Sequence, residues 1–328
     1  MNDLTIVMYH YVRNIKDSQY QNIKGLETDG FRRQLDYLSD NFNIIKAEVL
    51  IDFVKNDIKL PKNSCLLTFD DGYKDHLTFV LPELLKRKLQ GSFFPPVKPV
   101  LEREILDVNR IHFILACTKD FSKLVYDVDN LCIDHGITPV DLISFKSKFA
   151  IPSRYDTADV MYVKHVLQHV LSEDIRNSIS SKLFQKYVNR TELEFSDELY
   201  LSIDETKKLI ESGMYVGSHG YRHLWLDKET YESQSSEIDS SLKFLKDCGA
   251  STNNWIMCYP YGAYNDDTLS ILKERNCAVG LTTKVGLAKV SRDFSLELAR
   301  FDTNDFPQEC FFKIATCVTA LKLSVENE

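Results

Sequence analysis

The stretch Leu66-Leu67-Thr68-Phe69-Asp70-Asp71-Gly72-Tyr73 joins a run of apolar residues to two adjacent carboxylates and a glycine. The apolar run from residue 65 to residue 69 predicts a buried strand. Side-chain alternation lapses where a strand ends, so both carboxylates can point into one cleft, and Gly72 allows backbone conformations closed to other residues. Adjacent carboxylates repel each other unless a cation or a proton separates their roles. The alternative is a capped turn that opens the next helix, since Asp is a good N-cap.

Strands and helices alternate on both sides of a long helical stretch. We expect strands at residues 4–8, 42–45, 65–69, 91–94, 214–217, 255–258, 278–282 and 296–300. This alternation implies right-handed crossovers and a parallel sheet or barrel, hence an α/β fold. Prolines and glycines become sparse between these two regions, and helical periodicity dominates there. We therefore expect a barrel formed by residues 1–98 and 197–328, with a helical insertion at residues 99–196.

Composition and charge exclude several classes of partner. The chain has 328 residues and a net charge of −8, and no basic patch dominates it, so we expect no nucleic-acid partner. No apolar run approaches the roughly 20 residues of a membrane span. The eight cysteines are scattered without a CxxC pair, which favours buried thiols in a reducing compartment. The first residues lack the pattern of a secretory signal, so we expect a cytoplasmic protein.

Polar, titratable residues follow successive predicted strands. They are His10, Asp70, Asp71, His219, His223, Tyr261, Arg300 and Asp302. The carboxyl ends of the strands in parallel α/β folds share one face, and that face holds the site. Two histidines and one carboxylate make a three-ligand zinc set with a position left for water, the pattern of catalytic zinc. His165 and His169 also have metal-capable spacing, but without an acidic partner they are interpreted as surface or interface histidines.

Four of these stretches resemble motifs of the polysaccharide deacetylases of carbohydrate esterase family four. Residues 68–72 match the motif TFDDG, and residues 219–223 match H(S/T)xxH with glycine in second place. Residues 259–262 and 300–305 resemble the third and fourth motifs. The resemblance covers roughly residues 4–96 and 200–306. It implies an irregular (β/α)7-type barrel with a helical insertion, and a metal-dependent deacetylase that acts on N-acetylated sugars.

The resemblance also implies a role for each matched residue. Asp71, His219 and His223 would bind Zn²⁺, or another divalent metal, and Asp70 would be the general base. A metal held in this way polarises a carbonyl and lowers the pKa of a water molecule. The backbone N–H of Tyr261 would then face the oxyanion of the tetrahedral intermediate.

Two positions depart from the family pattern. The third motif usually starts with an arginine that orients the catalytic aspartate, and Cys258 stands there instead. Arg300 either supplies this charge from a neighbouring strand or forms a plain structural ion pair. The last motif ends in a histidine that acts as general acid, but no histidine follows His223. His10 is the expected replacement unless it is a structural histidine, and Asp302 or a metal-bound water is the next candidate.

The leading hypothesis is a zinc-dependent enzyme that hydrolyses an N-acetyl group on an amino sugar or glycan intermediate and releases acetate. One alternative keeps the metal chemistry but acts on a non-sugar amide. Another is a non-catalytic carbohydrate-binding relative that has lost its acid catalyst. The insertion needs burial for its apolar positions. We expect it to cap the rim of the site, to contribute to a homodimer, and to favour small substrates.

Overall fold

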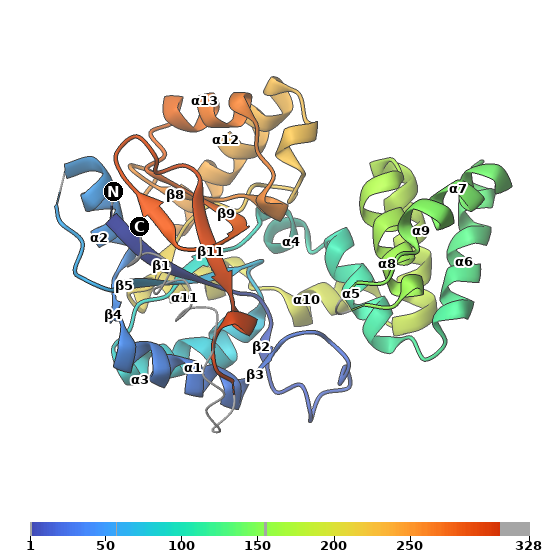
Figure 1. Ribbon diagram of the computed structural model, residues 1–328, viewed down its shortest axis with the longest axis horizontal. Helices are drawn as coiled ribbons and strands as arrows, with labels where there is room; N and C mark the ends of the chain where they lie inside the picture. Colours follow the sequence, from blue (N-terminus) through green and yellow to red (C-terminus); the bar gives the residue numbers. More distant parts are fainter. Residues whose placement is uncertain (1, 57, 154–155, 309–328) are drawn as a thin grey trace, which may run out of the picture. The chain divides into compact units, whose positions relative to one another are not determined.

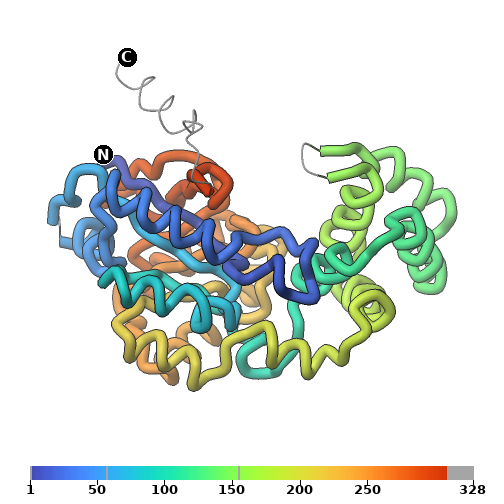
Figure 2. The backbone as a smooth tube through the Cα atoms, turned by 90° about the horizontal axis from the view of Figure 1, so that it is seen from below, coloured from blue at the N-terminus to red at the C-terminus, as the bar shows by residue number. Residues whose placement is uncertain are grey.

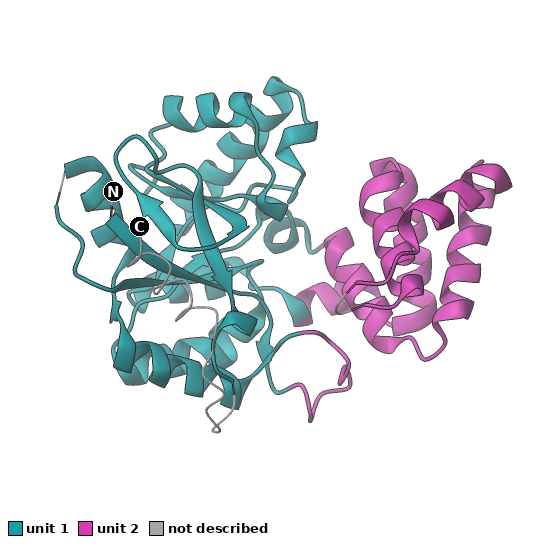
Figure 3. Ribbon diagram, viewed as in Figure 1, with its two compact units in different colours: residues 1–14, 25–103, 199–328 teal, residues 15–24, 104–198 magenta. Residues whose placement is uncertain are grey.

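The structure is a computed structural model that describes residues 2–56, 58–153 and 156–308. The chain forms two compact units (Figure 3). The barrel unit comprises Met1–Asn14, Gly25–Arg103 and Leu199–Glu328, and the helical unit comprises Ile15–Lys24 and Glu104–Glu198. The helical unit thus includes a segment, 15–24, that the expected insertion at residues 99–196 does not contain. Cys310, Cys317 and the last part of the expected barrel segment 197–328 lie outside the described residues.

The barrel unit is built on a parallel sheet (Figure 1). Its strands are β1 (Asn2–Tyr9), β4 (Asn43–Ile44), β5 (Ser64–Asp70), β6 (Ser92–Phe94), β7 (Tyr215–Val216), β8 (Ile256–Cys258), β9 (Val279–Val285), β10 (Ala288–Val290) and β11 (Leu298–Asp302). The order is β7-β6-β5-β1-β11-β9-β8, with β4 added to β5 and β10 paired antiparallel with β1. The short strands β2 (Val12–Arg13) and β3 (Leu26–Glu27) form a separate pair.

The two edge strands of this sheet meet where β7 ends. Ser218 forms a parallel bridge with Met257. Its N–H donates to the Ile256 carbonyl at 3.1 Å, and its carbonyl accepts from the Cys258 N–H at 2.9 Å. The curled parallel sheet, surrounded by helices, confirms the predicted α/β class and its (β/α)-barrel architecture.

Helices cover the outside of the sheet. Those of the barrel unit are α1 (Thr28–Asn41), α2 (Ala47–Asn56), α3 (Leu81–Arg87), α4 (Val97–Glu102), α11 (Ile203–Glu211), α12 (Tyr231–Cys248) and α13 (Asp266–Glu274). Helices α1 and α3 run side by side (Figure 2), joined by ion pairs of Arg32 with Glu83 and of Arg87 with Asp36 at 2.7 and 2.9 Å. Helix α11 begins with the capping box of Ser202 and Glu205 that its sequence predicts.

The alternation of β5 divides its side chains between two faces of the sheet. Leu67 and Phe69 pack with residues of α1 and α3 on one face. Leu66 packs on the opposite face with residues of β1, β8 and β9. Because successive side chains of a strand point to opposite faces, Thr68 and Asp70 lie on the same face as Leu66. The strand therefore delivers Asp70 to the enclosed face of the sheet at its carboxyl end.

The helical unit has an aromatic core of its own. It contains α5 (Asp107–Cys117), α6 (Phe121–Asp134), α7 (Pro139–Phe149), α8 (Ala158–His165), α9 (Glu173–Val188) and α10 (Glu192–Leu199). Tyr20 makes edge-to-face contacts with Phe113 and Phe195 at centroid distances of 4.9 and 5.6 Å, which explains why the segment 15–24 belongs here. His165 stacks on Phe149 at 5.2 Å, and the described residues hold no metal-capable group around it.

The helices that the structure describes, in both units, include none with the length and apolarity that a bilayer crossing requires.

Candidate active site

Two left-handed residues follow the end of β5. Asp71 has a φ of 70° and Gly72 a φ of 63°. A Cβ atom on Gly72 would lie 2.7 Å from Cβ and 2.9 Å from Cα of Pro95, so only glycine fits this turn. The reversal of the backbone breaks the alternation of the strand, and both carboxylates of the pair are buried near the same histidine.

Asp71, His219 and His223 come together as a compact donor set. Oδ1 of Asp71 lies 3.3 Å from Nε2 of His219 and 3.4 Å from Nε2 of His223. A tetrahedral zinc ion with ligand bonds of about 2.0–2.1 Å has ligands roughly 3.3 Å apart, so these distances fit such an ion. Nδ1 of His219 donates to the Cys258 carbonyl at 2.7 Å, which leaves Nε2 as the atom available for a metal.

The ionisation of this set couples Asp71 to its histidines. Burial raises the pKa of Asp71, but hydrogen bonds from His219 and His223 hold that pKa well below its ordinary value. Burial lowers the pKa of His219, whereas Cys258 and the Asp71 carboxylate raise it, so that it ends well above its ordinary value. Asp71 is thus an anion whose charge is balanced by an imidazole proton, and a bound cation would take the place of that proton.

Tyr73 supports the carboxylate of Asp71 from the side away from the histidines. Its hydroxyl donates to Oδ2 of Asp71 at 2.5 Å. Its buried ring stacks on that of Tyr11 at a centroid distance of 4.2 Å. Burial, reinforced by the charge of Asp71, raises the pKa of Tyr73 well above its ordinary value, so the hydroxyl remains a donor. Sequence reasoning missed this role, although Tyr73 directly follows Gly72.

Asp70 is paired with Arg300, and both are 1% exposed. Nη1 of Arg300 donates to Oδ1 of Asp70 at 3.0 Å and lies 2.8 Å from Oδ2, while Nε donates to the Thr282 carbonyl at 2.7 Å. Burial raises the pKa of Asp70, but the charges of Arg300 and then His10 lower it below its ordinary value. Asp70 is therefore an ionised carboxylate next to the donor set, suited to accepting a proton.

His10 lies at the end of β1, on the solvent side of Asp70. Its Nε2 is 3.9 Å from Oδ2 of Asp70, and its side chain is 39% exposed. The backbone carbonyl of His10 accepts a hydrogen bond from Nε2 of His76 at 2.9 Å. His76 is fully buried, and burial lowers its pKa to about 4. No sequence pattern indicates His76, because a single histidine in a helical stretch matches no motif.

Tyr261 follows β8 and contacts the donor set through its ring. It has a left-handed backbone, with a φ of 58°. Its ring centroid lies 4.6 Å from that of His223 and 4.2 Å from that of Trp225, on which it stacks nearly parallel at 5°. Nζ of Lys228 lies 4.8 Å from the ring centroid of Trp225. Trp225, in the turn that follows His223, therefore packs against the ring of Tyr261.

Asp302 is the last residue of β11, where it pairs in register with Met8 of β1. Its Oδ1 accepts hydrogen bonds from the backbone N–H of Asn304 at 2.9 Å and from the side-chain amide of Asn304 at 2.6 Å. These contacts cap the short 3-10 turn Thr303–Asp305. Among the described residues Asp302 contacts neither Asp70 nor Asp71, so its local geometry is that of a cap.

Comparisons with known proteins show which family part of this chain resembles. The family model described as polysaccharide deacetylase matches residues 179–280, which include both histidines of the donor set. A Bacillus subtilis (strain 168) protein named as a polysaccharide deacetylase, YxkH, is 34% identical over 94 residues. This stretch of the chain is thus similar to polysaccharide deacetylases. The matched stretch is 29% of this chain and spans 33% of the Bacillus subtilis relative.

Solved deacetylase structures share the fold. The Streptococcus pyogenes deacetylase PplD, in complex with acetate, aligns with a TM-score of 0.57 at 18% identity, covering 92% of both chains. IcaB from Ammonifex degensii aligns with a TM-score of 0.53 at 17% identity, covering 92% of this chain and 91% of its own. A de-N-acetylase from Aggregatibacter actinomycetemcomitans aligns with a TM-score of 0.53 at 15% identity, covering 92% and 96%. At these identities the likeness concerns the polysaccharide deacetylase fold alone.

Proposed function

We propose that this polysaccharide deacetylase relative hydrolyses the N-acetyl group of an amino sugar in a metal-dependent reaction that releases acetate. One observation carries the proposal: the ionised, buried carboxylate of Asp70 lies beside a donor set whose spacing fits a divalent metal. Protein names among the structural neighbours, a de-N-acetylase and a deacetylase in complex with acetate, point to the same bond. A pure binding protein has no need of a general base in this position.

Asp71, His219 and His223 would hold the metal, with Zn²⁺ as the first candidate because the donors are two imidazoles and one carboxylate. When bound, such an ion polarises an acyl carbonyl and lowers the pKa of a nearby water molecule. Asp70 takes the proton of the attacking water, and Arg300 keeps Asp70 ionised and oriented. The backbone N–H of Tyr261 donates to the oxygen that becomes negative in the tetrahedral intermediate.

The leaving amine then needs a proton, and His10 is the residue we assign to this step. It is the histidine 3.9 Å from Asp70, and its partly exposed ring can exchange protons with solvent. His76 donates a hydrogen bond to the backbone carbonyl of His10. This bond fixes the backbone after β1 and therefore the position of the His10 imidazole. His10→Ala is expected to slow turnover and to flatten the basic limb of the pH profile. Unchanged kinetics would leave His10 a structural residue.

Acetate release tests the proposed function directly. Metal-stripped protein, reloaded with zinc or another divalent ion, is offered N-acetylated monosaccharides, nucleotide sugars, short oligomers and simple non-sugar amides. We expect metal-dependent acetate release from at least one sugar. Turnover of the simple amides alone would favour the amide-hydrolase alternative. No turnover, with sugar binding retained, would favour a non-catalytic carbohydrate-binding protein.

The two adjacent carboxylates separate the catalytic and metal-binding roles. Asp70→Asn is expected to keep bound metal and lose a factor on the order of 10²–10⁴ in rate, the usual contribution of a positioned general base. Asp71→Asn is expected to lose metal first, and His219→Ala to lose metal and activity together. Elemental analysis measures the metal content. Full occupancy in His219→Ala, or reversed phenotypes of the two aspartate variants, would contradict the assignment.

A further inference from the structure

The loop between the two histidines of the donor set has an unusual backbone. Residues 220–222 connect His219 to His223. Gly220, the first residue of this loop, and His223, directly after it, have left-handed backbones, with φ values of 73° and 62°. A left-handed conformation costs a residue with a side chain about 1–2 kcal/mol. Such a loop keeps its shape only if surrounding groups hold it, and its shape sets where both imidazoles point.

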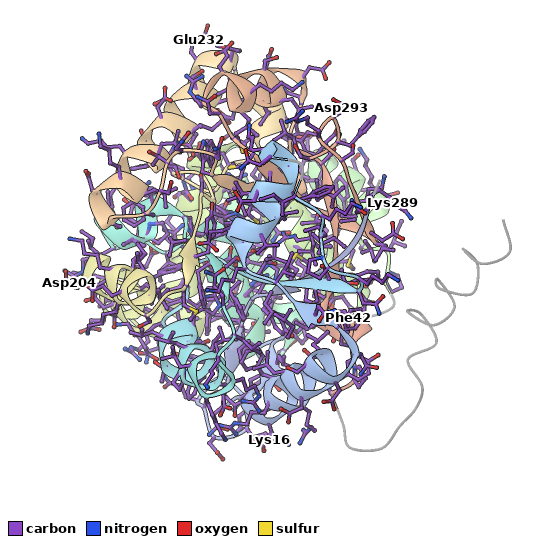
Figure 4. The ribbon with its side chains drawn as sticks, turned by 90° about the vertical axis from the view of Figure 1, so that its left-hand side faces the viewer. Lys16, Phe42, Asp204, Glu232, Lys289 and Asp293 are labelled. Carbon is purple, nitrogen blue, oxygen red and sulfur yellow. The ribbon has the colours of Figure 1, made fainter. Side chains whose placement is uncertain are left out.

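Glu237 of α12 accepts hydrogen bonds from two residues of the loop. Its Oε2 accepts the backbone N–H groups of Tyr221 at 3.1 Å and Arg222 at 2.8 Å. Its Oε1 accepts Nε of Arg222 at 2.7 Å. Glu237 is 3% exposed, whereas Glu232 of the same helix points outward (Figure 4). A buried carboxylate is expensive unless its oxygens are satisfied, and here both oxygens are taken up by one short loop.

The remaining polar groups of the loop backbone bond to other elements. The Gly220 N–H donates to Oγ of Ser218 at 3.2 Å. The carbonyls of Gly220 and Tyr221 accept the N–H groups of Val97 and Lys98, at the start of α4, at 3.3 and 2.8 Å. Glu237 accepts two consecutive backbone N–H groups and the side chain of Arg222, so one substitution at Glu237 alters three contacts of the loop.

We propose that Glu237 is a positioning residue: it fixes the loop 220–222 so that His219 and His223 present Nε2 atoms at metal-binding distance from Asp71. It touches neither the donor atoms nor the reacting groups, and it acts through the backbone. The expected effect of Glu237 on zinc binding rests on the proposed function of the donor set. The loop part of the inference, that Glu237 holds residues 220–222, does not, because these hydrogen bonds are present without metal.

Glu237→Gln tests this role with the smallest change of shape. A carboxamide has one acceptor oxygen, whereas the loop presents donors to both oxygens of Glu237, so one donor of Tyr221 or Arg222 loses its partner. The matched control is Asp239→Asn on the same helix, whose carboxylate is paired with Arg275 at 2.6 and 3.0 Å on the surface. Both substitutions remove one negative charge from α12 and leave a single acceptor oxygen next to an arginine side chain.

Two measurements are made on wild type and both variants. Zinc affinity is obtained by competition with a chelator, and amide hydrogen exchange of Tyr221 and Arg222 is followed in metal-free protein. We expect Glu237→Gln to bind zinc about 10–100-fold more weakly, as supporting residues of metal ligands do, and to lose amide protection at Tyr221, at Arg222 or at both. Asp239→Asn should match wild type in both.

Wild-type zinc affinity in Glu237→Gln overturns the inference, whatever the exchange data show, because Glu237 would then at most order a loop. Weaker zinc binding with unchanged amide protection overturns it too, since the effect would not pass through the loop. If wild type itself binds no zinc, the proposed function fails, and unchanged protection in Glu237→Gln would overturn the loop part separately. If Glu237→Gln does not fold, Glu237→Asp replaces it, since this variant keeps the charge and shortens the side chain.

Discussion

Arg300 reaches Asp70 across 230 residues of sequence, and the contact is fully buried. In the family pattern an arginine stands where this chain has Cys258. Here the positive charge comes instead from β11, and Cys258 lies within metal-ligand spacing of Asp70 and His219. The small thiol leaves room for the guanidinium of Arg300. At the residue scale, Asp70 therefore has an arginine partner, Arg300, on β11.

The first prediction concerns this pair. In Arg300→Met, Asp70 remains buried without its partner, which costs about 3–5 kcal/mol of stability. Burial then acts on Asp70 without the opposing charge of Arg300, so the pKa of Asp70 should rise. In a plot of kcat/KM against pH, the acid limb of Arg300→Met should lie at higher pH than that of wild type. The acid limb of Arg300→Lys should lie between them. An acid limb that stays in place would mean that Arg300 is only structural.

The second prediction concerns His76 and stability. Its pKa is about 4 in the folded protein, against an ordinary value of 6.5, because burial penalises the charged form. Below pH 6.5 the unfolded chain therefore binds a proton that the folded protein does not, and stability falls as pH falls towards 4. The His76 contribution to this loss between pH 7 and 5 is about 2 kcal/mol.

His76→Gln keeps an N–H donor for the His10 carbonyl and removes the titration. Urea unfolding of metal-free protein at pH 7 and pH 5 should therefore show a smaller drop in stability for this variant than for wild type. Equal drops in the two proteins would contradict the burial of an uncharged His76.

At the scale of elements, the turns after β7 and β8 support each other. Trp225, in the turn after the second histidine, stacks on Tyr261, in the turn after β8. Tyr261 has a left-handed backbone and in turn contacts His223. The aromatic stack therefore links the backbone position of Tyr261 to the position of His223 in the donor set.

The third prediction follows from this stack. Trp225→Ala removes a contact worth about 0.5–1.5 kcal/mol, so we expect kcat to fall roughly two- to tenfold as Tyr261 loses its support. Trp225→Phe should recover most of the rate. The control is Tyr264→Ala, which breaks a comparable stack on Tyr259 at 4.8 Å outside the donor set. Steady-state kinetics on metal-saturated protein make the comparison, and equal losses in the two alanine variants would contradict the link.

At the scale of the whole molecule, helix α7 of the helical unit exposes two apolar side chains. Val140 and Ile143 are 74% and 70% exposed, and residues three positions apart lie on the same side of a helix. Exposed apolar residues that lie next to each other can form part of an interaction surface. This supports the expectation that the insertion contributes to a homodimer, which stays a prediction, as does the preference for small substrates.

The fourth prediction concerns the homodimer and the preference for small substrates. Light scattering should give a dimer for wild type and a monomer for the double variant Val140→Lys and Ile143→Lys, with acetate release per chain unchanged. The substrate panel should show faster turnover of monosaccharides or nucleotide sugars than of long oligomers. A wild-type monomer that prefers long oligomers would contradict the expected roles of the insertion.

The sequence by itself determined the fold class and which side chains come together. Strand-helix alternation requires a parallel sheet, and a parallel sheet collects the residues that follow its strands, so Asp70, Asp71, His219 and His223 had to converge. Local patterns also predicted the capping box of α11 and the separate helical stretch, because both depend on neighbours in sequence.

Only the tertiary structure decided what holds these side chains in place. Glu237 bonds to the loop 220–222, Arg300 pairs with Asp70, and Asp302 caps the turn Thr303–Asp305. It also decided that residues 15–24 join the helical unit. Each depends on a contact between groups distant in sequence, or on which of several local hydrogen bonds a side chain makes. Periodicity and spacing carry no information about either, because the free energy of such contacts depends on geometry that exists only after the elements have packed.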